Sequence, residues 1–178
     1  MSSGNTASDA PAYTALFSMN GGGTDVNVKS TVKVIDPANI EKKPGMAKAG
    51  HTIQSLVGSM IPTDRMRVTL ATYEPNVLEK LHWHPIEAFY FIISGHVIVR
   101  DIEGKATELG PGMSIYCPAG IAGAHEWETK DRVQLIAFRA TPDADRKPQF
   151  TVDKETMRSY VDLEDLAWSE SISFKSHY

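Results

Sequence analysis

The sequence is a series of short β-forming runs separated by turn residues. Residues 66–73 alternate in side-chain character, and the run ends at Pro75-Asn76. Residues 88–100 are rich in aromatic and β-branched side chains, with a break at Gly95, and we expect them to form a β-hairpin. Further strands are expected at residues 29–35, 52–57, 113–117 and 132–138. Many short strands with frequent turns favour an all-β sandwich or barrel.

The chain is expected to hold one barrel with an extension at each end. Residues 1–28 show little periodicity and contain a Gly-Gly-Gly run, which predicts a flexible N-terminal arm. The barrel is expected to occupy residues 29–141. Residues 142–178 begin with a polar linker and are too few for a core of their own, so we expect a C-terminal tail that packs on the barrel or on a partner subunit. The large apolar residues of this tail are Trp168, Ile172 and Phe174.

Composition narrows the classes of function. A chain of 178 residues is long enough for one domain with a sizeable core. A net charge of −4 and a pI near 5.8 argue against nucleic acid as a partner. The sequence contains no apolar run of about 18 residues, so we expect no membrane span. Its first residues do not form a charged region followed by an apolar one, so we expect no secretory signal. The single cysteine, Cys117, fits a reducing cytoplasm, and we expect a buried, inert thiol there.

Three histidines are candidates for a metal site. His82 and His84 are separated by one residue, so in an extended strand both imidazoles point to the same face. His125 follows in a later strand-like segment. Imidazole nitrogen suits iron, zinc, nickel and copper and also occurs with manganese. We therefore predict a three-nitrogen metal site, against the alternatives of solvent-facing histidines on an edge strand and a surface-loop His125.

The surroundings of His82 and His84 resemble the first motif of the cupin family. That motif contains a Gly, a His-x-His pair, a carboxylate and a closing Gly. Asn76 stands at the first Gly position, and Asn tolerates the left-handed backbone that Gly would supply. Gly95 closes the motif.

The second cupin motif is matched by Gly112, Pro118 and Gly120, with His125 two residues late. A small bulge or a longer loop is needed to bring His125 into place. The resemblance covers about residues 66–140. It implies an all-β cupin fold, which is a double-stranded β-helix or jelly-roll barrel, and it points to a homodimer.

The sequence departs from the family at the carboxylate. Counting back from Gly95 places Ala88 at that position, and Glu87 comes one residue early. A shift of one residue in a strand turns the side chain to the other face. Either the site has three histidines and Glu87 points away, which we favour, or a turn at Pro85 absorbs one residue and Glu87 reaches the metal.

The resemblance also indicates a class of reaction. Cupins that similarly lack the carboxylate include thiol dioxygenases and a diketone-cleaving dioxygenase. We therefore expect an Fe(II) three-His dioxygenase that acts on a small oxygen-bearing organic substrate with O2, although zinc, manganese or nickel could occupy the site. One alternative is a non-redox lyase, isomerase or hydrolase that uses the ion as a Lewis acid, with Glu87 or Tyr90 as base. Another is a non-catalytic ligand-binding cupin.

Other side chains are assigned by face. Tyr90 and Ile92 share a face with Ala88, so Tyr90 could offer its hydroxyl to a substrate or to bound oxygen. Trp127 shares a face with His125 and could form an aromatic wall.

The remaining histidines and two arginines are expected to lie outside the site. We predict surface positions for His51 and His177 and no ligand role for His96. For Arg67 and Arg139 a solvated position is expected rather than a substrate clamp.

Overall fold

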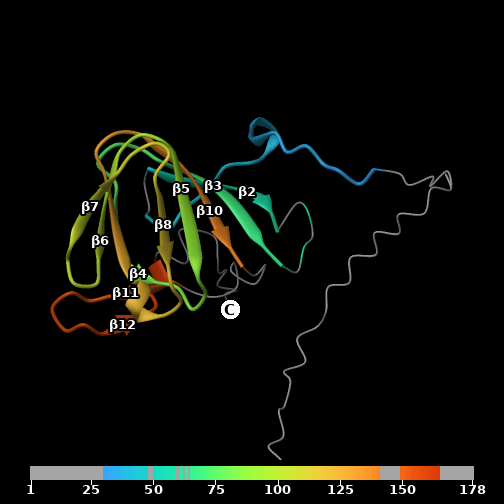
Figure 1. Ribbon diagram of the computed structural model, residues 1–178. Helices are drawn as coiled ribbons and strands as arrows, with labels where there is room; N and C mark the ends of the chain where they lie inside the picture. The colour runs from blue at the N-terminus through green and yellow to red at the C-terminus, as the bar shows by residue number, and fades with distance from the viewer. Residues whose placement is uncertain are drawn as a thin grey trace, which may run out of the picture. The chain divides into compact units, whose positions relative to one another are not determined.

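The fold consists of two antiparallel β-sheets of six strands each, seen in a computed structural model (Figure 1). The structure describes residues 30–47, 50–58, 61, 63, 65–140 and 149–164. The main hydrophobic core draws residues from both sheets, including Ile92, Leu135 and Val97. The predicted all-β class is thereby confirmed.

The order of the strands shows how distant parts of the chain come together. The first sheet runs in the order β1 (Lys43–Pro44), β2 (His51–Val57), β3 (Arg67–Tyr73), β10 (Val133–Arg139), β5 (Ala88–Ser94) and β8 (Ser114–Cys117). The second runs in the order β12 (Ser159–Tyr160), β11 (Phe150–Val152), β4 (Leu78–Trp83), β9 (His125–Thr129), β6 (Val97–Asp101) and β7 (Ala106–Leu109). Most neighbours within a sheet are not consecutive in the sequence, as expected for a jelly roll.

The expected hairpin across Gly95 is wrong. Both strands form, but β5 pairs with β8 and β10, whereas β6 pairs with β7 and β9. Gly95 has a positive φ of 79°, a conformation that glycine adopts without strain. The chain therefore crosses from one sheet to the other at this residue. The apolar faces of the two sheets can then pack against each other, whereas a hairpin would keep both strands in one sheet.

β5 shows the alternation that the sequence predicted. Ala88, Tyr90 and Ile92 are buried, whereas Phe89 and Phe91 remain exposed on the outer face. Ala88, Tyr90 and Ile92 therefore share the inward face of β5, as their spacing in the sequence predicted.

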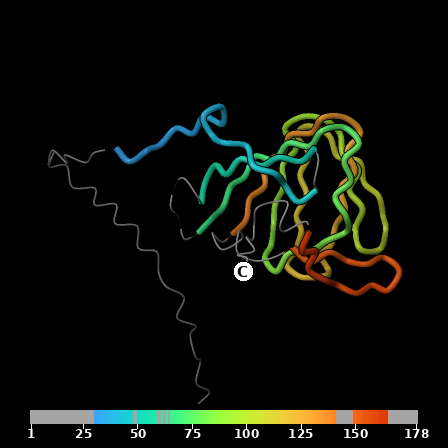
Figure 2. Tube along the Cα trace, turned by 180° about the vertical axis from the view of Figure 1, so that it is seen from behind, coloured from blue at the N-terminus to red at the C-terminus, as the bar shows by residue number. Residues whose placement is uncertain are grey.

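Near the chain ends, the described residues begin at residue 30 and include residues 149–164. The expected strand at 29–35 is wrong for its described part, since residues 30–35 form no strand. The predicted arm at 1–28, the linker at 142–148, and Trp168, Ile172, Phe174 and His177 lie outside the described residues. Residues 149–164 add β11 and β12 to the edge of β4, and this red segment lies at one end of the strands in Figure 2.

Two short 3-10 turns complete the described elements, η1 (Pro37–Asn39) and η2 (Ile121–Gly123). In the part of the chain that the structure describes, no helix is both long and apolar enough to cross a membrane.

Candidate metal centre

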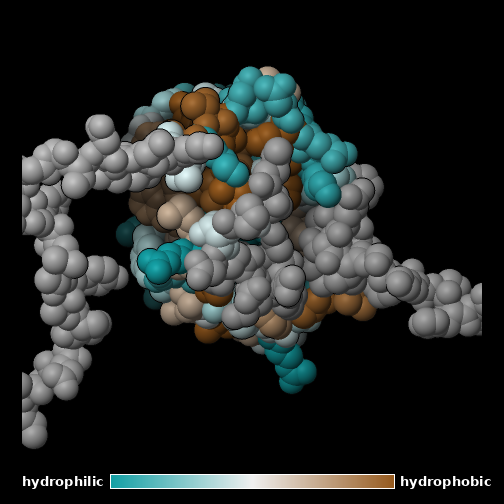
Figure 3. Space-filling model, turned by 90° about the vertical axis from the view of Figure 1, so that its right-hand side faces the viewer, coloured by the Kyte–Doolittle hydropathy of each residue, from teal (hydrophilic) through white to brown (hydrophobic). Residues whose placement is uncertain are grey.

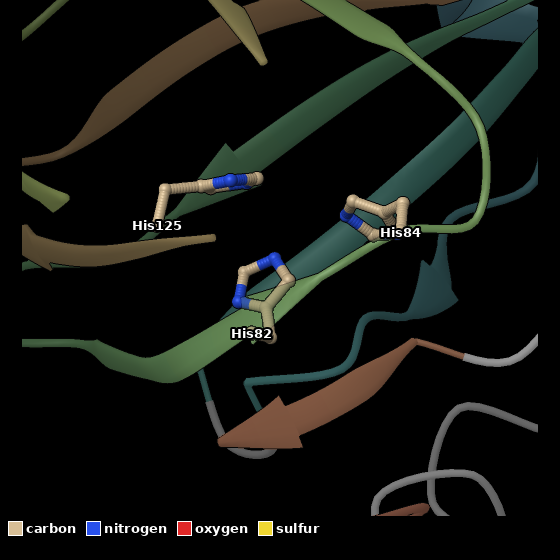
Figure 4. A group of neighbouring side chains, drawn as sticks. All are labelled: His82, His84 and His125. Carbon is tan, nitrogen blue, oxygen red and sulfur yellow. The ribbon is translucent and has the colours of Figure 1, made fainter. Parts of the chain in front are cut away.

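His82, His84 and His125 meet in the interior, as Figure 4 shows. His82 lies near the end of β4, and His84 follows that strand directly. His125 is the first residue of β9 and is the Cα partner of His82 across the two strands. Strand pairing thus brings the third imidazole to the first two, although the sequence separates them by about forty residues.

The late position of His125 is accommodated by η2. Gly120 enters this turn with a positive φ of 85°, and its N–H donates a hydrogen bond of 2.8 Å to the carbonyl of His84. A side chain at Gly123 would collide with the carbonyl of Pro118. The expected longer loop is therefore present, and it is tied by its backbone to the first histidine pair.

Backbone carbonyls orient two of the three rings. The Nδ1 of His82 lies 2.7 Å from the carbonyl oxygen of Lys80, and the Nδ1 of His125 lies 2.8 Å from that of Gly123. Such contacts place the ring proton on Nδ1 and leave Nε2 with a free lone pair. The candidate ligand atoms of the three histidines all lie within 4.8 Å of one another.

Burial keeps these imidazoles neutral. The residues His82, His84 and His125 have exposed fractions of 1%, 5% and 2%. Burial lowers the pKa of all three histidines, and it lowers the pKa of His125 to about 3. Among the described residues, the buried Nε2 of His125 finds no hydrogen-bond partner. Since buried nitrogen lone pairs are normally satisfied, this set of donors fits a divalent metal ion.

Glu87 is not brought to the three histidines. Its side chain is exposed, and its Oε2 accepts a hydrogen bond of 2.8 Å from the hydroxyl of Tyr116. Ala88, with an exposed fraction of 2%, takes the inward position. Asn76 has the expected left-handed backbone, with a φ of 61°. The register that Gly95 indicated therefore places a methyl group where the cupin motif has a carboxylate.

A different carboxylate, which sequence reasoning missed, lies beside the centre. The Oε1 of Glu79 is 3.8 Å from the Nε2 of His82, and its Oε2 accepts a hydrogen bond of 2.7 Å from Tyr73. Burial alone would raise the pKa of Glu79, but the neighbouring His82 and His51 and the hydrogen bond from Tyr73 outweigh burial and lower it to about 2. Strict alternation sends Glu79 and His82 to opposite faces, but a register shift in β4 between these two residues lets both point inward.

His51 was expected at the surface, and this prediction is wrong. It begins β2, has an exposed fraction of 6%, and stacks on Tyr73 with ring centroids 3.9 Å apart. Pairing of β2 with β3 sets His51 opposite Tyr73 and covers the ring. Its Nδ1 accepts a hydrogen bond of 3.2 Å from the N–H of Ala47. His51, Tyr73 and Glu79 therefore form a buried row that leads to His82.

Arg139 was expected to be solvated, but it reaches the centre. Its Nη2 lies 3.5 Å from the Nε2 of His84 and 3.5 Å from the hydroxyl of Tyr90, and the side chain is half-buried. The Tyr90 hydroxyl is itself 3.4 Å from the same Nε2. Burial raises the pKa of Tyr90 to about 12, so the hydroxyl stays protonated at neutral pH. Arg67, on the neighbouring strand, is also half-buried.

Other predicted neighbours lie where the sequence placed them. Trp127 packs against His125 with ring centroids 5.7 Å apart. Cys117 is buried, and burial raises the pKa of its thiol to about 12, as expected for an inert cysteine. His96 is exposed beside Asp131 and does not belong to the histidine cluster.

Comparisons with known proteins agree with this fold. Among solved structures, the polyketide cyclase RemF from Streptomyces resistomycificus is 19% identical, with a TM-score of 0.55, covering 61% of this chain and 79% of that chain. A cupin sugar phosphate isomerase from Silicibacter pomeroyi is also 19% identical, with a TM-score of 0.54 and coverage of 73% and 93%. A variant of the oxalate decarboxylase from Bacillus subtilis is 15% identical, with a TM-score of 0.56; the match covers 70% of this chain but 34% of that one.

These identities show a shared fold and do not specify a reaction. No curated protein sequence matches the chain significantly. Residues 69–138, which run from β3 to β10 and include all three histidines, match the family model described as Cupin domain. The match to the Cupin domain model over residues 69–138 and the two-sheet fold therefore support the resemblance to the cupin superfamily.

Proposed function

We propose that this chain is a metal-dependent enzyme, and that Fe(II) held by His82, His84 and His125 serves a dioxygenase reaction on a small oxygen-bearing organic substrate. The observation that carries the proposal is the convergence of three neutral, buried imidazoles on one point with Ala88 at the carboxylate position. Three neutral ligands leave open coordination positions for a chelating substrate and O2. The chemistry that iron would supply when bound is the reaction of O2 with the substrate.

The residues around the histidines have separate roles in this proposal. Tyr90 and Arg139 offer hydrogen-bond donors next to His84 and would orient the substrate. Trp127 packs against both His125 and Tyr90 and contributes an apolar wall that excludes water. Glu87 lies away from the histidines, so we assign the role of neighbouring carboxylate to Glu79 instead.

The buried carboxylate of Glu79 favours a second candidate. A deprotonated carboxylate 3.8 Å from a ligand nitrogen could act as a general base in a lyase, isomerase or hydrolase reaction that needs no O2. The ion would then serve as a Lewis acid, and zinc or manganese could replace iron.

One experiment separates the two candidates. Protein loaded with Fe(II) without air would be mixed with a panel of β-diketones, α-hydroxyketones and small organic carboxylic acids, and O2 uptake and product would be followed. The dioxygenase proposal expects uptake and incorporation of both atoms of labelled O2 into product, and His125→Ala should abolish both. Turnover by the zinc-loaded protein without O2 would overturn it in favour of the Lewis-acid reaction. Fe(II) loading without O2 uptake on the whole panel would also count against it.

A further inference from the structure

Arg139 lies directly beside the position where the cupin carboxylate is missing. In the antiparallel register, Arg139 at the end of β10 is the Cα partner of Ala88 on β5 and of Arg67 on β3. A carboxylate at position 88 would have been next to this guanidinium. With alanine there, neither a metal ligand nor a counter-ion is supplied from that position.

Among the residues that the structure describes, Arg139 uses little of its hydrogen-bonding capacity. Its two contacts, with His84 and Tyr90, are both 3.5 Å long and come from a single nitrogen, Nη2. Contacts of this length are weak hydrogen bonds at best. Within the described ranges, Arg139 forms no ion pair with a carboxylate. A half-buried guanidinium that is not matched by an acidic group is costly unless an anion joins it.

The charges around the centre leave an excess of positive charge. In the described part of the chain, the Glu79 carboxylate lies beside His82, and Tyr73 and Gln149 donate hydrogen bonds to it. Among the residues that the structure describes, this one negative charge stands against the charge of a divalent ion and the charge of Arg139. A neutral substrate would leave this excess uncompensated.

Glu126, a second buried acidic residue among those that the structure describes, does not change this balance. It is paired with Arg100 and Lys154. Its charge is therefore already matched by two cations, and the centre near Arg139 keeps its positive character.

We propose that the substrate carries a carboxylate that occupies the place vacated at Ala88, binding the metal ion with one oxygen and Arg139 with the other. Tyr90 donates a further hydrogen bond to the same group. Arg139 is thereby a residue that determines substrate specificity, and it selects small organic carboxylates over neutral analogues. This inference rests on the proposed metal centre and not on the use of O2.

The test measures carboxylate binding separately from turnover. Protein loaded with Co(II) would be titrated with acetate and with acetamide, which is similar in shape but neutral, and the visible spectrum of the cobalt would report binding. We expect acetate to bind at least about tenfold more tightly than acetamide, because a charge-assisted contact is lost with the amide. Arg139→Gln should weaken acetate binding by about tenfold or more without lowering cobalt content. Arg139→Lys should recover part of the acetate affinity.

Arg132→Gln is the matched control. Arg132 is exposed and paired with Glu74, so its loss should leave acetate affinity unchanged. Equal affinities for acetate and acetamide, no binding of acetate at all, or undiminished acetate binding by Arg139→Gln would overturn the proposal while leaving the metal centre intact. Failure of the native protein to bind cobalt would overturn the metal centre and this inference together. Circular dichroism and cobalt content establish that each variant is folded.

Discussion

The carboxylate of Glu79 and the imidazole of His82 lie side by side in the interior, with Oε1 3.8 Å from Nε2. The two residues are three positions apart in one strand, and only the register shift in β4 turns both to the same side. A negative charge so close to three neutral imidazoles increases the affinity of the centre for a cation.

We therefore expect Glu79→Gln to weaken metal binding by about ten- to a hundredfold. The amide keeps an acceptor for Tyr73, so the loss of charge is the main change. Competition with a chromophoric chelator would measure the affinity. Glu87→Gln is the matched control, because the Glu87 carboxylate lies at the surface with Tyr116 and should leave the affinity unchanged. Equal losses in both variants would contradict this assignment.

Replacing a ligand histidine should empty the centre. We expect His82→Ala to reduce bound zinc to background, whereas His96→Ala, at an exposed position paired with Asp131, should bind as the native chain does. Zinc at a hundredfold excess over its dissociation constant should also stabilise the native fold by about 2.7 kcal/mol, and His82→Ala should lose this gain. Elemental analysis and thermal unfolding with and without zinc measure the two effects. Full zinc occupancy in His82→Ala would show that another residue is the ligand.

The metal-free protein should lose stability as the pH falls below about 6.5. His125 has a folded pKa of about 3, against about 6.5 when unfolded, so between these values the unfolded chain binds the extra proton. The free energy of unfolding should therefore fall with decreasing pH by about 1 kcal/mol per pH unit for this residue. Urea unfolding between about pH 7.5 and about pH 5.5 measures the slope. His125→Gln, which cannot take up this proton, should give a shallower slope; an identical slope would contradict the assignment.

The outer face of β5 makes a homodimer our expectation. Phe89, Phe91 and Ile93 have exposed fractions of 40%, 38% and 41%, and Phe138 of β10 lies beside Phe89. Hydrophobic surface is also visible between hydrophilic areas on the face drawn in Figure 3. A second copy would bury such side chains. Light scattering should give a dimer mass for the native chain and a lower mass for Phe91→Asp; a monomer mass for the native chain would contradict the prediction.

The positions of His82, His84 and Ala88 in the site could be predicted from the sequence. The spacing of His82 and His84 sets them on one face of a strand, and the distance to Gly95 sets Ala88 inward. The first inference depends only on the two-residue period of an extended chain, which holds whatever the strand's neighbours are. The second also needs the spacing of the cupin motif that the sequence resembles. The left-handed backbone at Asn76 followed from its place at the first Gly position of that motif and from the tolerance of Asn for this conformation.

Tertiary structure decided what surrounds the histidines. The sequence by itself determined the β class and predicted the three candidate ligands, because periodicity and residue chemistry are local properties. The separation of β5 from β6, the burial of His51 by β3, and the position of Arg139 opposite Ala88 depend on which strands pair. The inward turn of Glu79 depends on a register shift that alternation cannot anticipate. Strand pairing is set by contacts between distant parts of the chain, so the charges around the centre could be known only from the folded structure.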